Sequence, residues 1–290
     1  MHPSSFEYFA PTKVEEALEL LSKYGEEAKI MAGGQSLIPL LKLRIAAYSY
    51  VIDISRVKGL NKIRETGDFL EIGALTTVNE LEENEFVKEK YRILHEAAVQ
   101  IADPLVRNRG TVGGNISHGD PSNDLPAVAI ATKAKLEIVG KKGKRVVDAD
   151  SFITDSFTTS LEEGEILDKV LVPIPEVSSG GCYIKQKKSA GDFSVAAVAI
   201  NLVLAEDETV KSAGIGLTSV APKPTRAKKA ERYIEGKKIN DSVAREAARI
   251  IVSEAEPSTD FYGSADYKRK VLGRIAEEAI NLAFERGLVR

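Results

Sequence analysis

Apolar positions at helical spacing near the start of the chain predict a first amphipathic helix. Gly25 follows the pattern and should end the helix, and Thr12-Lys13-Val14-Glu15 has the spacing of a capping box at its start. The apolar face consists of Val14, Ala17, Leu18 and Leu21. Short apolar runs at 28–31 and 50–54 are typical of strands, and an apolar turn (37–43) lies between them. Together these patterns predict a small α/β subdomain over residues 1–56.

From residue 57 to 176 the pattern alternates between strand-like and helical segments. A second capping box, Thr77-Val78-Asn79-Glu80, precedes a long helix expected over 86–101. Residues 125–131 are apolar enough for a buried helix, with Asp124 as a candidate cap. The expected strands are 69–75, 135–139, 144–148 and 166–172. We expect these strands to form a mixed sheet.

A Pro-rich and Gly-rich stretch, 172–181, predicts a domain boundary. The predicted domains are therefore 1–176 and 177–290. After the boundary, the strand-like runs 183–188, 195–205 and 210–220 predict a three-stranded antiparallel sheet, and the end of the chain is helical. The predicted fold class is α+β in both parts.

Composition excludes several classes of function. Forty Lys and Arg against 43 Asp and Glu leave a net charge of −3, which argues against a nucleic-acid or membrane-surface binder. Cys182 is the only cysteine and the three histidines are scattered, so the chain is not expected to bind an iron–sulfur cluster or a metal ion. Any redox role must use a bound organic cofactor. The chain shows neither an apolar run of about 20 residues nor a signal peptide, so a cytoplasmic location is expected.

Two glycine loops carry the candidate chemistry. Ala32-Gly33-Gly34-Gln35-Ser36 and Thr111-Val112-Gly113-Gly114-Asn115 combine a Gly pair with hydroxyl and amide side chains. Glycine lets main-chain N–H groups converge on an anion, so the loops have the equipment to bind a diphosphate. Neither loop fits the GxGxxG or the GxxxxGK[ST] pattern, and each alone could be a plain turn.

The sequence around both loops resembles that of a known family. The segments AGGQSLIPLLKLR (32–44), RNRGTVGGNISHGDPSNDLPA (107–127) and YIKQKKSAGDFSVAAV (183–198) are similar, in order and spacing, to the FAD-binding medium subunit of the molybdenum hydroxylases. That family includes the flavoproteins of carbon monoxide dehydrogenase, xanthine dehydrogenase and aldehyde oxidoreductases. The resemblance implies an FAD-binding PCMH-type domain of the vanillyl-alcohol oxidase fold, followed by a smaller α+β domain of the carbon monoxide dehydrogenase flavoprotein type.

The resemblance also implies which residues contact FAD. Residues 30–37 would wrap the diphosphate and ribityl chain, 111–115 would hold the other side of the diphosphate, and Ile101 would pack near the adenosine or the ring. The full set is Ile30, Met31, Ala32, Gly33, Gly34, Gln35, Ser36, Leu37, Ile101, Gly110, Thr111, Gly113, Gly114, Asn115, Asp124, Leu167 and Lys185. Gln35 stands where several relatives carry His.

Three side chains near the later motifs each have two possible roles, and a fourth has no assigned role. Asp124 either accepts hydrogen bonds from cofactor hydroxyls or backbone amides, or caps a helix. Lys185 would lie close to the flavin ring, against the alternative of a surface lysine, and Tyr183 either covers the ring or belongs to the core. Asp192 has no assigned role.

The implied function is electron transfer within a complex. The chain would take electrons from the [2Fe–2S] clusters of a small subunit and pass them to NAD, a quinone or another acceptor. A molybdopterin-containing large subunit would oxidise the substrate, and the complex would be a dimer of heterotrimers. The sequence shows no nucleophile–base pair, so we expect no acid–base catalytic residue in this chain. The alternatives are a self-contained flavin oxidoreductase and a non-catalytic nucleotide-binding module.

Overall fold

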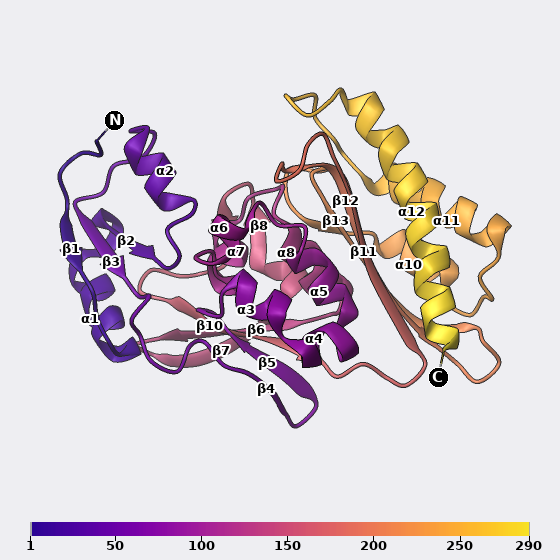
Figure 1. The fold of residues 1–290 in the computed structure, drawn as a ribbon, viewed down its shortest axis with the longest axis horizontal. Coiled ribbons are helices and arrows are strands. Elements are labelled where there is room, and N and C mark those ends of the chain that lie inside the picture. Colours follow the sequence, from indigo (N-terminus) through magenta and orange to yellow (C-terminus); the bar gives the residue numbers. More distant parts are fainter. Residues whose placement is uncertain (1, 290) are drawn as a thin grey trace.

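The N-terminal unit is a parallel three-stranded sheet with two helices (Figure 1). In the computed structural model, which describes residues 2–289, its strand order is β1-β3-β2. Its elements are β1 (Glu7–Phe9), α1 (Val14–Tyr24), the 3-10 helix η1 (Gly25–Glu27), β2 (Ala28–Met31), α2 (Leu37–Lys42) and β3 (Tyr50–Asp53). The ring centroids of Tyr24 and Tyr50 lie 3.8 Å apart, and those of Phe9 and Tyr24 lie 5.3 Å apart. These stacked rings pack α1 against the sheet.

The central unit is a five-stranded sheet with short helices above it (Figure 1). Its strand order is β4-β5-β10-β6-β7, and every pairing is antiparallel. The strands are β4 (Ile63–Thr66), β5 (Phe69–Gly73), β6 (Lys135–Gly140), β7 (Gly143–Asp148) and β10 (Ile166–Pro173), beside the small hairpin of β8 (Ile153–Asp155) and β9 (Thr158–Thr159). The helices are α3 (Val78–Glu83), α4 (Glu85–Lys90), α5 (Arg92–Ala98), α6 (Pro104–Arg107), α7 (Val112–His118), α8 (Asp124–Ala131) and α9 (Ala149–Phe152).

The C-terminal unit is an antiparallel four-stranded sheet backed by helices on the side away from the central unit (Figure 1). Its strands are β11 (Ser179–Lys187), β12 (Ser194–Leu204), β13 (Val210–Thr218) and β14 (Thr225–Arg226), paired in that order. Its helices are α10 (Lys228–Ile234), α11 (Asp241–Glu254) and α12 (Ala265–Leu288). None of the helices within residues 2–289 combines the length and the apolar character needed to cross a bilayer.

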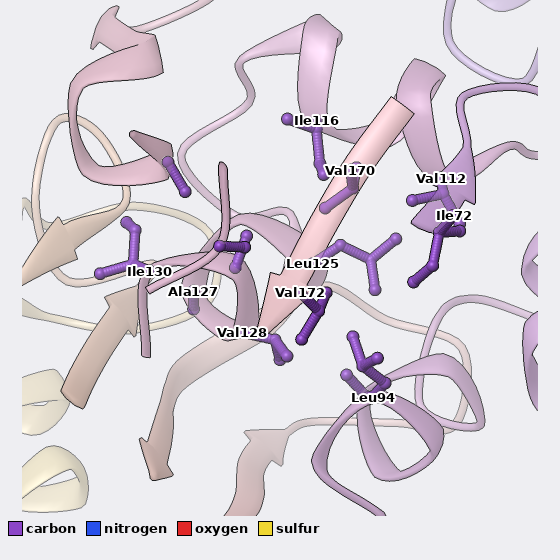
Figure 2. Packing of buried hydrophobic residues seen from close by; sticks show 14 of the residues in the cluster. Ile72, Leu94, Val112, Ile116, Leu125, Ala127, Val128, Ile130, Val170 and Val172 are labelled. Atoms are coloured by element: carbon purple, nitrogen blue, oxygen red, sulfur yellow. The ribbon is translucent and has the colours of Figure 1, made fainter. Parts of the chain in front are cut away.

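Helix α8 joins the central and C-terminal units. All of its residues are buried, and it packs against β12 and β13 as well as α5. A side chain at Gly214 or Gly216 of β13 would collide with the carbonyl oxygen of Ala131 or Ala127, so glycine lets the helix lie directly on the strand. Figure 2 shows Leu125 and Val128 of α8 among the buried side chains of α7 and β10. The same hydrophobic cluster includes Tyr183, Ala197 and Ala199 of the next sheet.

The periodic patterns located most elements correctly. The first helix, the strands at 69–75, 135–139, 144–148 and 166–172, and the three strands after the boundary are confirmed to within a few residues. Thr77 and Glu80 form the expected capping box, with Glu80 N–H donating to Thr77 Oγ1 at 3.1 Å. The α+β fold class is confirmed in both parts.

Several expectations were wrong. No side chain caps the start of α1, because the N-cap residue is Lys13, whose side chain has no acceptor, and Thr12 N–H donates to the Glu16 carboxylate. The helix expected over 86–101 divides into α4 and α5 at Tyr91, whose hydroxyl donates to Glu65 at 2.6 Å. The apolar turn 37–43 contains a helix, α2. The central sheet is antiparallel and not mixed, and the last sheet gains a fourth strand of two residues.

Candidate functional site

The structure brings the two glycine loops together. A side chain at Gly33 would collide with the carbonyl of Arg109, so the first loop rests on the main chain just before the second. The position of a Cβ on Gly114 would lie 3.7 Å from the Cβ of Ala32. The loops therefore share one site at the junction of the N-terminal and central units, although they are far apart in the sequence.

The first loop leaves its hydrogen-bond donors free. Gly34 has a φ of +74°, a left-handed conformation that glycine adopts without strain. Within residues 2–289, no acceptor receives a hydrogen bond from the main-chain N–H of Gly33, Gly34, Gln35 or Ser36, and the Gln35 and Ser36 side chains make none either. Main-chain donors on successive residues of such a turn form an anion-binding concavity, which fits the diphosphate of FAD.

Most main-chain N–H groups of the second loop already donate hydrogen bonds within the protein. Thr111 caps α7 by accepting from Gly114 N–H at 3.0 Å, and Gly113 N–H donates to the Ala74 carbonyl at 2.8 Å. A Cβ on Gly113 would lie 2.5 Å from the Cβ of Ala74. Gly113 therefore lets α7 pack against the residue after β5. That residues 111–115 hold the other side of the diphosphate stays a prediction, in which the main-chain N–H groups of Gly113 and Gly114 already have partners inside the protein.

Asn115 is the part of the second loop that is still available. Its main-chain oxygen accepts from Asn123 Nδ2 at 2.7 Å. Its side-chain Oδ1 is buried and has no hydrogen-bond partner among the described residues. A buried oxygen in this state is costly unless another group donates to it. Asn115 thus fits a ligand that brings a donor, such as a cofactor hydroxyl.

Asp124, Tyr183 and Lys185 form a buried polar cluster across the seam between α8 and β11. The Tyr183 hydroxyl donates to one Asp124 oxygen, and Lys185 Nζ lies 3.0 Å from each. Burial raises the pKa of the Asp124 carboxyl above its usual range, against the opposing effect of the Lys185 ammonium. Burial likewise raises the pKa of Tyr183, and the neighbouring Asp124 adds to that shift.

The geometry of this cluster bears on the alternatives left open for three residues. Asp124 is not a helix cap, since Asn123 holds the N-cap position of α8. The Lys185 side chain is only 1% exposed and is therefore not a surface lysine. Tyr183 is a core residue, 3% exposed, with its hydroxyl committed to Asp124. Lys185 also donates to the Gln100 carbonyl at 3.2 Å, which places the cluster beside Ile101.

The remaining site residues lie around the loops or in the core. Ile30 and Met31 end β2 and Leu37 begins α2, so they flank the first loop. The Gly110 carbonyl accepts from Val78 N–H at 2.8 Å, and Leu167 is buried in β10 beside a bulge. Asp192 accepts from Ser189 N–H at 3.1 Å, so it closes the turn between β11 and β12.

Arg107 was not among the predicted site residues. It lies in the RNRG segment that carries the family resemblance, and this was the signal that could have singled it out. Its guanidinium pairs with Glu82 and donates to the Ile101 carbonyl at 3.0 Å. The side chain therefore connects two parts of the candidate site.

Two family models match the chain. Residues 4–175 match the FAD binding domain in molybdopterin dehydrogenase. Residues 181–283 match the CO dehydrogenase flavoprotein C-terminal domain.

Known proteins are similar over nearly the whole length. The carbon monoxide dehydrogenase medium chain of Hydrogenophaga pseudoflava is 41% identical over 286 residues, covering 99% of each chain. The glyceraldehyde dehydrogenase medium chain of Sulfolobus acidocaldarius is 36% identical over 272 residues, covering 94% of this chain and 96% of that one. A solved structure of the Hydrogenophaga pseudoflava carbon monoxide dehydrogenase, lacking the Mo-pyranopterin moiety of its cofactor, has a TM-score of 0.96 at 42% identity and covers 99% of both chains. The glycine loops, the fold and these matches agree, and the chain belongs to the FAD-binding medium subunits of the molybdenum hydroxylases, the flavoprotein subunits of oxidoreductase complexes.

Proposed function

We propose that this chain is the electron-transfer subunit of a molybdenum hydroxylase complex that also contains a small [2Fe–2S] subunit and a molybdopterin-containing large subunit, assembled as a dimer of heterotrimers in the cytoplasm. The chain receives electrons from the iron–sulfur clusters and delivers them to an external acceptor such as NAD or a quinone. Two relatives that match nearly the whole chain are named as the medium chains of a carbon monoxide dehydrogenase and of a glyceraldehyde dehydrogenase, which supports a place beside other subunits. The large subunit therefore determines which substrate the complex oxidises.

The proposal assigns FAD binding to residues 1–176 and a supporting role to 177–290. Within the first part, residues 1–56 contribute the loop at Gly33 and residues 57–176 contribute the loop at Thr111. The ranges of the two family matches, 4–175 and 181–283, support this division.

The observation that carries the proposal is the row of four unpaired main-chain donors at 33–36. Gly33, the first residue of this row, packs against the main chain of Arg109 and Gly110, directly before the second loop. Residues 33–36 hold the diphosphate, Asn115 accepts from a cofactor hydroxyl, and the Lys185 cluster lies behind Ile101. The flavin ring supplies the electron-transfer chemistry, and the protein supplies binding and orientation.

Substitution of Gly34 tests the site. In Gly34→Val, a β-branched side chain opposes the left-handed φ of +74° and its Cβ lies 2.6 Å from Ile38 Cδ1, so the donors are displaced. We expect the FAD released by acid from the purified protein to fall at least tenfold per chain.

Gly67→Val is the matched control. Gly67 has a φ of +58° in the turn between β4 and β5, and a Cβ there meets no atom within 4 Å. It carries a similar backbone strain away from the loops, so its FAD content should equal that of the unmodified protein. If Gly34→Val retains as much FAD per chain as Gly67→Val, the first loop does not bind the cofactor.

A further inference from the structure

We propose that Arg107 is a positioning residue for FAD, which holds the wall of the site between Ile101 and Gly110 in its binding conformation. This inference rests on the proposed function, because it assumes that the two glycine loops bind the cofactor. It concerns a residue that does not itself reach the loops' donors.

The Arg107 guanidinium makes three bonds that fix its position. Its Nε lies 2.6 Å from Glu82 Oε2, its Nη2 lies 3.4 Å from Glu82 Oε1, and its Nη1 donates to the Ile101 carbonyl at 3.0 Å. The side chains of Arg107 and Glu82 are 12% and 23% exposed, so water screens the pair less than it screens a surface pair. A planar guanidinium can make all three bonds at once, whereas an ammonium lacks that fork.

The anchor itself is held by the helices of the central unit. Glu82 belongs to α3, and its carbonyl oxygen lies 3.0 Å from His95 Nδ1 of α5. Arg107 therefore ties the end of α6 to a packed pair of helices.

The tethered segment needs such an anchor because its own backbone is strained and little buried. Ala102 has a φ of +44°, which is unfavourable for a residue with a Cβ, and it directly follows the held carbonyl of Ile101. Asp103, Pro104 and Leu105 are exposed, and Leu105 is 78% exposed. Without Arg107, the Ile101 carbonyl would lose its guanidinium partner, and the packing of Ile101 and Ala102 on the core would be left to oppose relaxation of Ala102.

Relaxation there would reach the glycine loops. Gly110 N–H donates to the Val106 carbonyl at 2.7 Å, so the end of the segment follows α6. Gly33 rests directly on Arg109 and Gly110. A shift of α6 therefore moves the surface on which the first loop, with its free donors, is supported.

The experiment compares Arg107→Gln and Arg107→Lys with Arg92→Gln in the full chain, purified with the subunits that accompany it. Arg92 pairs with Glu96 at 3.1 Å, but it is 61% exposed and lies on α5, so its loss is a matched control. The bound flavin is removed, and the dissociation constant of added FAD is measured from its fluorescence. The urea midpoint of the FAD-free protein is measured in parallel.

We expect Arg107→Gln to weaken FAD binding at least tenfold, Arg107→Lys to weaken it less, and Arg92→Gln to leave it unchanged. The FAD-free urea midpoints should stay close to that of the unmodified protein. Glu82→Gln should weaken binding, and the double variant should bind no more weakly than Arg107→Gln, because both changes break one network.

An unchanged dissociation constant in Arg107→Gln would overturn the inference. So would a loss of affinity accompanied by an equal loss of FAD-free stability, because that pattern indicates a general structural role. If Arg107→Gln does not fold, Arg107→Lys decides in the same way. Gly34→Val separates the two levels: if it loses FAD while Arg107→Gln retains it, only this inference fails, and if both retain FAD, the proposed site fails as well.

Discussion

Some glycines at this site allow two main chains to pack closely, and others allow a ligand to approach the main chain. A Cβ added to Gly113 would lie 2.7 Å from the carbonyl oxygen of Ala74. Gly113 belongs to α7 and Ala74 directly follows β5, so neither main chain can move away easily. The two Gly pairs look alike in the sequence. Only the three-dimensional partner of each glycine distinguishes a free turn from a packed one, so the sequence could locate the loops but could not divide their roles.

Gly113→Ala should therefore destabilise the fold and not only FAD binding. An extra methyl group in a well-packed contact typically costs about 1–3 kcal/mol. Urea unfolding should show a lower midpoint than the unmodified protein. Gly273→Ala is the control, because its Cβ would lie at an ordinary 3.4 Å from Val252 within a helix, where alanine is favoured. Equal midpoints for both variants would show that α7 moves away from Ala74 freely.

At the scale of elements, the polar cluster at the seam connects α8 to β11. Lys185→Met would leave the Asp124 carboxylate buried with Tyr183 as its remaining partner. Removing one member of a buried ion pair costs roughly 3–5 kcal/mol, so the free energy of unfolding should fall by about that amount at neutral pH. The double variant Asp124→Asn with Lys185→Met should recover most of the loss, as measured by urea denaturation.

The pH dependence of Lys185→Met gives an independent check. A carboxyl whose folded pKa is raised stabilises the folded protein below its unfolded pKa, and that stability is lost as the pH rises through the folded pKa. The loss in Lys185→Met should therefore be smaller at acidic pH than at neutral pH. Lys238→Met, which removes an exposed pair with Glu208, should change little at either pH. A loss independent of pH would show that removing Lys185 leaves the folded pKa of Asp124 unchanged.

Elements were predictable where local pattern and tertiary contacts agree. The capping box at Thr77 and the alternation in β6 and β7 need no distant partner to be recognised. The helix breaks at Tyr91, whose hydroxyl donates to Glu65 on another element, and the local period does not reveal this break. The pairing of Asp124 with Lys185 escaped prediction for the same reason, since each was interpreted against the cofactor and not against the other.

At the scale of the whole molecule, the inventory of redox groups predicts dependence on partners. One buried cysteine cannot ligate a cluster, and no group of three or more His, Cys, Asp or Glu side chains within residues 2–289 is arranged to hold a metal ion. We expect the chain purified from its native source to bring iron and molybdenum with it, and the isolated chain not to oxidise the substrate of the complex. Metal analysis and an activity assay of both preparations test this. A fully active preparation without either metal would favour the self-contained oxidoreductase.

The way α8 lies on β13 also restricts how such proteins can diverge or be recombined. Gly214 and Gly216 fit the carbonyls of Ala131 and Ala127, and Asp124 on the same helix meets Tyr183 and Lys185. A larger residue at either glycine has to be accompanied by a helix that lies farther from the sheet, which would also separate the charged partners. Helix α8 and the sheet must therefore match each other. A chimera of two relatives would have to take α8 and the strands from β11 to β13 from the same parent.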